Sequence, residues 1–107
     1  MIRVRLPDES AATTLVLRKL CLEAMGATTA ADTPAALTAI AQMRWCVVDV
    51  PSVHGEFRQR FDLGLNDAEA WLRVGDLAAA TTTLESVRRL VIEIERSMER
   101  PHGDSAA

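Results

Sequence analysis

The stretch Asp76–Met98, DLAAATTTLESVRRLVIEIERSM, carries the most regular apolar pattern in the chain. Its apolar residues recur at alternating steps of three and four over about three heptads. They form one seam, made of Leu77, Ala80, Leu84, Val87, Val91, Ile94 and Met98. This spacing predicts an amphipathic helix. Such a helix needs apolar surface opposite it, which either the same chain or a second molecule must supply.

A tight turn precedes this helix. Gly75 is placed to end one helix, and the carboxylate of Asp76 is placed to cap the next. The residues upstream, from Val53 to Val74, repeat apolar side chains at steps of three and four. We therefore expect a helical hairpin with two nearly equal, antiparallel arms.

Two interpretations of the first arm remain open. The first is a single helix from Val53 to Val74 with a kink near Gly64. The second is a break at Gly64, because Asn66 and Glu69 have the spacing of a capping box that would start a new helix.

The N-terminal half predicts two further helices. One begins at Asp8 or Ser10, where cap oxygens are available, and runs to Met25, with Gly26 as its stop. It is apolar around most of its circumference, which favours a central or covered position.

The second of these helices has a strong start signal. Asp32 offers a cap, and Pro34 lies in the first turn, where proline is favoured. We expect this helix to end near Asp49, because Val50 precedes Pro51 and a residue before proline avoids helical angles.

These elements predict an all-α fold: an antiparallel four-helix bundle in a single domain over residues 1–107. Residues 1–7 are expected to form a short extended arm and residues 101–107 a frayed tail. The alternative is an α+β fold. Ile2–Leu6 alternates apolar and basic residues as a strand does, and Trp45–Val50 is its one candidate partner.

Composition and charge exclude several classes of function. The formal net charge is −3 and the estimated pI is 5.3, so the chain lacks the basic face that nucleic acid or an anionic membrane surface requires. No apolar run reaches the length of a transmembrane helix. Lys19 is the only lysine among 12 basic residues, and this arginine excess suggests a GC-rich bacterial coding sequence.

The cysteines and histidines predict no metal site. Cys21 and Cys46 fall on apolar helical faces, as reduced cysteines of a cytosolic protein do. Their spacing to His54 and His102 matches no zinc pattern. Nothing at the N-terminus resembles a signal peptide, so we expect a cytoplasmic protein without a metal or cofactor.

The sequence supports two classes of function. The first is a small interaction module, not an enzyme, that forms a homo-oligomer or docks on a protein partner through the seam. Secondary contact candidates are Leu17, Leu20 and Ile92. The second is a small-ligand-binding protein or small enzyme with a pocket near Trp45, His54, Phe57 and Trp71. We favour the first, because the predicted inner faces offer few convergent polar groups.

Overall fold

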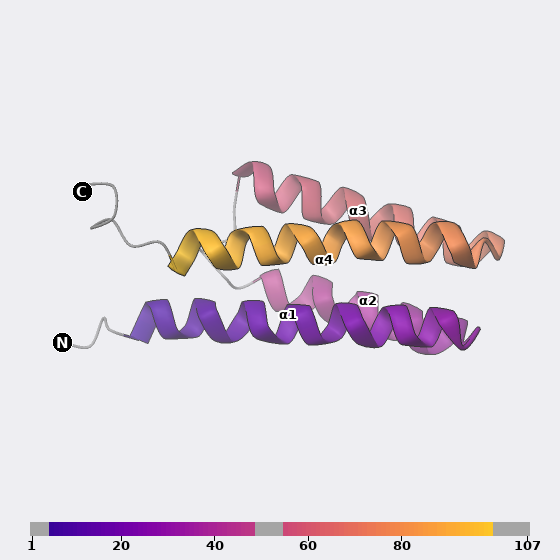
Figure 1. Ribbon diagram of the computed structural model, residues 1–107, viewed down its shortest axis with the longest axis horizontal. Coiled ribbons are helices and arrows are strands. Elements are labelled where there is room, and N and C mark those ends of the chain that lie inside the picture. The colour runs from indigo at the N-terminus through magenta and orange to yellow at the C-terminus, as the bar shows by residue number, and fades with distance from the viewer. Residues whose placement is uncertain (1–4, 49–54, 100–107) are drawn as a thin grey trace.

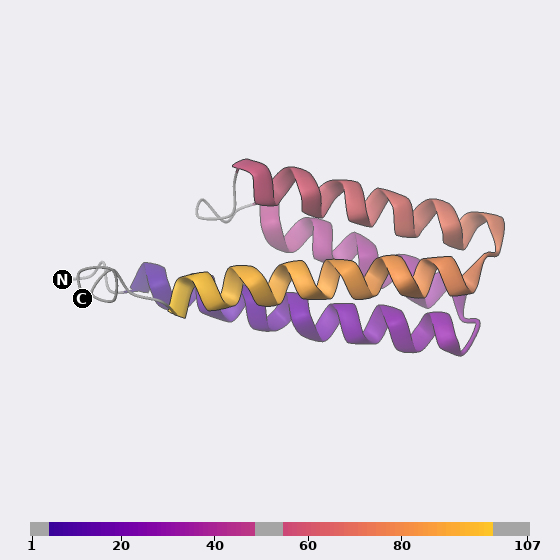
Figure 2. The ribbon, with the colours of Figure 1, turned by 45° about the horizontal axis from the view of Figure 1, so that its top comes forward.

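The computed structural model describes residues 5–48 and 55–99, with the side chains of residues 13–47 and 55–96. The described chain forms helices α1 (Arg5–Thr29), α2 (Thr33–Val48), α3 (Gly55–Val74) and α4 (Leu77–Glu99). Helices α1 and α2 form one antiparallel hairpin, and α3 and α4 form the other (Figure 1). The two hairpins join mainly through the contact between α1 and α4. The contact between α2 and α3 is smaller. Figure 2 shows the same four-helix arrangement from a second direction. The predicted all-α bundle is confirmed.

The α+β alternative is wrong. Trp45 to Val48, the proposed partner strand, belongs to α2, and Arg5 and Leu6 belong to α1. Within the described residues there is no strand. Residues 2–4 and 49–50, the remainder of the two segments, lie outside the described residues, as does the expected tail at 101–107.

The expected extended arm over residues 1–7 is wrong for residues 5–7, because α1 begins at Arg5. Pro7 is the third residue of this helix. Proline is tolerated there because the N–H groups of the first turn have no partner within a helix.

The expected stop at Gly26 is also wrong, since α1 continues to Thr29. Threonine hydroxyls bond back into its final turn: Thr28 Oγ1 donates to the Ala24 carbonyl at 2.8 Å, and Thr29 Oγ1 donates to the Met25 carbonyl at 3.0 Å. Thr28 is buried, so this hydroxyl needs an internal partner. A glycine inside a helix costs only about 1 kcal/mol relative to alanine, and the surrounding packing overrides that cost.

The two turns follow the predicted cap chemistry. The carboxylate of Asp32 accepts a hydrogen bond from the Ala35 amide at 3.2 Å, and that of Asp76 accepts one from the Ala79 amide at 3.1 Å. Gly75 has a φ of 85°, which a residue without a Cβ adopts freely. The predicted starts of α2 and α4 are therefore confirmed.

Helix α3 runs unbroken from Gly55 to Val74, so the single-helix interpretation is confirmed over these residues and the alternative, a break at Gly64, is wrong. Gly64 has a different role. A Cβ atom on it would lie 2.6 Å from Val87 Cγ2, so the missing side chain lets α3 approach α4 closely. Asn66 and Glu69 do not form the expected capping box, because both accept hydrogen bonds from Arg44 of α2.

The core lies along the seam of α4. Four seam residues are buried: Ala80, Leu84, Val87 and Val91. Helix α1 contributes Leu17, Leu20, Cys21 and Ala24 to this core, and α3 contributes Phe57, Phe61, Leu65, Ala68 and Leu72. The chain itself therefore supplies the apolar surface that the seam requires. Burial of each fully buried leucine side chain contributes roughly 1.5–3 kcal/mol to the stability of the fold.

Candidate functional site

The predicted interaction seam is the inner face of the bundle. Leu77 and Ile94 are half-buried at its two ends, and the four seam residues between them are buried. The side chain of Met98 lies outside the described side chains. Of the secondary candidates, Leu17 and Leu20 are in the core and Ile92 is half-buried. In this fold a partner could reach the buried residues only if α1 or α3 moved away, so the surface available to a partner consists of the exposed side chains.

The pocket predicted from Trp45, His54, Phe57 and Trp71 is not formed by the described members of that set. Trp45 lies on the outer side of α2 and is 72% exposed. Phe57 and Trp71 lie 14 residues apart in α3, which corresponds to about 21 Å along a helix that rises about 1.5 Å per residue. His54 is outside the described residues.

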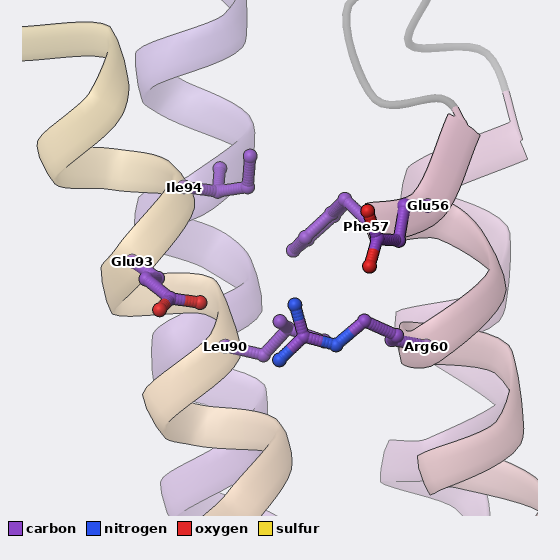
Figure 3. Close-up of a pocket in the computed structure, with 6 residues that line it drawn as sticks. All are labelled: Glu56, Phe57, Arg60, Leu90, Glu93 and Ile94. Atoms are coloured by element: carbon purple, nitrogen blue, oxygen red, sulfur yellow. The ribbon is translucent and has the colours of Figure 1, made fainter.

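Phe57 instead lines a different depression, which we call the α3/α4 hollow. Its lining is Glu56, Phe57, Arg60, Leu90, Glu93 and Ile94, and its volume is about 310 Å³. Figure 3 shows Phe57 and Ile94 pointing toward each other from α3 and α4, with Arg60 reaching toward α4. The hollow therefore has an apolar floor and a charged margin.

The hollow exists because α3 and α4 are not equally close along their length. They are joined by the turn at Gly75 and meet tightly where Gly64 faces Val87. Toward the N-terminal end of α3 the two helices diverge (Figures 1 and 2). The hollow occupies this divergent end, where Phe57 and Ile94 face one another.

The margin of the hollow carries charge that the described part of the chain does not neutralise. Within the described residues, Glu56, Arg60 and Glu93 form no ion pair within 4 Å, and all three are exposed. Nearby charges are paired: Glu85 lies 3.5 Å from both Arg88 and Arg89. Two carboxylates and one guanidinium leave the margin with a formal charge of −1.

Large apolar side chains also lie on the outside of the bundle. On α1, Leu15 is 54% and Leu22 is 56% exposed, and their separation of seven residues places them on one side of the helix. On α3, Leu63, Trp71 and Val74 are exposed at spacings that also place them along one side. Apart from Trp71, which was predicted to line a pocket, none of these exposed residues was predicted from the sequence, because their spacing fits a buried face equally well.

A polar cluster links α2 to α3. Arg44 Nη2 donates to Asn66 Oδ1 at 2.7 Å and to Glu69 Oε1 at 2.8 Å, and Arg73 Nη2 donates to Glu69 Oε2 at 2.6 Å. Hydrogen bonds from Arg73 and Arg44 hold the pKa of Glu69 below its ordinary value. This arrangement stabilises the contact between two helices.

The thiols are unsuited to nucleophilic chemistry. Cys21 is buried, with its Sγ 3.5 Å from Met43 Sδ, and burial raises its pKa to about 12. Burial also raises the pKa of Cys46. Both cysteines are free, as predicted. A thiol is a weak nucleophile until it ionises, so neither is an activated cysteine.

Neither a metal-binding cluster nor a membrane-spanning helix occurs among the described residues. No group of three or more His, Cys, Asp or Glu side chains there could hold a metal ion. None of the described helices has the length and hydropathy of a transmembrane segment.

Comparisons with family models, with curated proteins and with solved structures found no match for this chain.

Proposed function

We propose that the chain is a small helical interaction module, which self-associates or docks on a protein partner through apolar side chains on the outer faces of its helices. The observation that carries this proposal is the set of large apolar residues left exposed around a core that is already filled: Leu15, Val16, Leu22, Trp45, Leu63, Trp71 and Val74. Single exposed apolar residues are normal on a monomer. Aligned pairs and rows, as on α1 and α3, are typical of helices that meet another protein.

Catalysis and small-ligand binding have weaker support. The α3/α4 hollow is at the lower limit of ligand pockets, which span about 300–1,000 Å³, and its three charged groups all lie exposed at the margin. Neither thiol is activated. A protein partner also fits the net charge of −3 better than nucleic acid does.

We further propose that the protein acts in a bacterial cytoplasm. The arginine-rich composition supports a bacterial origin. The two free cysteines support a cytoplasmic location, because reducing compartments keep thiols unpaired.

Native mass spectrometry of the protein purified from its own host tests the proposal. We expect a multiple of the 11.7 kDa chain mass, or a second protein in a defined ratio. A monomer with a bound small molecule, seen as added mass, would contradict this proposal and support ligand binding at the α3/α4 hollow instead.

A further inference from the structure

The α3/α4 hollow leaves two carboxylates without an ion-pair partner in the described part of the chain, beside an apolar floor. A surface that complements it would present an apolar side chain between charged groups, with a cation opposite Glu56 and an anion opposite Arg60. Such a surface is found on the chain itself.

We define the α1 stripe as Leu15, Lys19, Leu22 and Glu23. Leu15 and Leu22 are more than half exposed, and Lys19 and Glu23 are exposed and form no ion pair within the described residues. Steps of four and seven place Leu15, Lys19 and Leu22 along one side of α1. The stripe thus offers two apolar anchors with a cation and an anion one helical turn apart.

The charge order of the stripe is the reverse of the order on the hollow. Along α1 the cation Lys19 comes four residues before the anion Glu23, and along α3 the anion Glu56 comes four residues before the cation Arg60. Residues four apart are neighbours on a helix surface. Two parallel helices in the right register would therefore place opposite charges together at both positions.

The stripe and the hollow lie at similar positions along the long axis of the bundle, as this register requires. Arg18 lies 3.5 Å from Glu95, so the neighbouring stripe residues lie at the same position along the bundle axis as the C-terminal half of α4. The hollow includes Ile94 of the same half. Helices α1 and α3 also run in the same direction (Figure 1). A second copy beside the first, with its long axis parallel, would bring α1 and α3 together at matching levels.

We propose that copies of this chain associate by seating the α1 stripe of one copy on the α3/α4 hollow of the next. Leu22 covers the apolar floor, Lys19 pairs with Glu56, and Glu23 pairs with Arg60. Because the stripe and the hollow are different surfaces, the contact is head to tail and gives a ring or an open chain. This inference rests on the proposed function and names the partner as a second copy.

Charge reversal tests the contact. Lys19→Glu and Glu56→Lys each place like charges opposite one another, so we expect each variant alone to associate at least tenfold more weakly in sedimentation velocity. An equimolar mixture should regain association, because each variant keeps one wild-type surface. Gln42→Glu and Gln42→Lys, at an exposed position of α2, serve as charge controls and should behave as wild type. Circular dichroism verifies that every variant stays helical.

The outcomes separate this inference from the proposed function. Wild-type association that survives both reversals, or a mixture that fails to regain it, overturns the head-to-tail contact and leaves the interaction module standing. A monomeric wild type that co-purifies with another protein does the same. A wild type that is monomeric and without any partner overturns both.

Discussion

Leu84 on α4 and Leu22 on α1 show how differently one residue type is used in this bundle. Both belong to helical stretches rich in apolar residues, yet Leu84 is 0% exposed and Leu22 is 56% exposed. Leu84 packs where α4 faces α1 and α3, whereas Leu22 lies on the outer side of α1. The inner seam therefore supports folding, whereas the α1 stripe stays exposed and is the surface that we propose for association.

Truncation of the inner seam should have the largest effect. Leu84→Ala removes a fully buried side chain and leaves a cavity, so we expect a loss of about 2–5 kcal/mol in the free energy of unfolding. Urea denaturation followed by circular dichroism measures it. A loss below about 0.5 kcal/mol, which is usual for surface substitutions, would show that Leu84 is not in the core.

Gly64 tests the close approach of α3 to α4. In Gly64→Ala the new Cβ would meet Val87 Cγ2 at 2.6 Å, and overpacking of this kind costs about 1–3 kcal/mol. The gain in helix propensity, about 1 kcal/mol, offsets part of that cost, so a net decrease in the melting temperature is expected.

Gly26→Ala is the matched control for Gly64→Ala. A Cβ at Gly26 meets nothing within 4 Å, and this glycine also lies inside a helix. The control should raise stability by roughly 0.4–1 kcal/mol. Equal responses at the two glycines would contradict the close contact with Val87.

Acid pH should weaken the polar link between α2 and α3. Because hydrogen bonds from Arg73 and Arg44 lower the pKa of folded Glu69, its contribution is complete above the ordinary value of 4.5 and is lost as the pH falls through the lowered value. Unfolding measured from pH 7 down to about pH 2 should show a smaller decline for Glu69→Gln than for wild type.

Arg44→Met supplies the second comparison for this link. It removes one of the two guanidinium groups that bind Glu69, so its pH profile should fall between those of wild type and Glu69→Gln. Three superimposable profiles would show that Glu69 contributes no pH-dependent stability.

Substitution in the α1 stripe should have the smallest effect on folding. Leu22→Ala exchanges an exposed side chain for a better helix former, so the free energy of unfolding should change by no more than about 0.5 kcal/mol. Self-association, measured by sedimentation, should weaken in the same variant. Marked destabilisation without any change in association would place Leu22 with the inner seam rather than with the stripe.

Much of the fold could be predicted from local sequence. The caps at Asp32 and Asp76, the glycine turn at Gly75 and the periodicity of α4 act within a few residues of one another, so their outcome is readable along the chain. The predicted end of α1 is wrong because packing overrides local preference, and the helix continues past Gly26. At Gly64 the local signals allowed either a single helix or a break, and the close contact with Val87 belongs to the single helix that the structure has.

The candidate site could not be predicted in the same way. Phe57 and Ile94 are far apart in sequence and share the hollow only because α3 and α4 diverge from their turn. Trp45, Phe57 and Trp71, which were predicted to line one pocket, share aromatic chemistry but not a location.

By itself, the sequence determined that this chain is helical, where two of its turns lie and which residues of α4 share one face. These features depend on backbone preferences and on the 3.6-residue period. Only the tertiary structure decided that other helices of the same chain cover the seam. Apolar periodicity identifies an apolar face, but it does not identify the surface that covers that face. The same packing left the α1 stripe and the margin of the α3/α4 hollow exposed on the outside of the bundle.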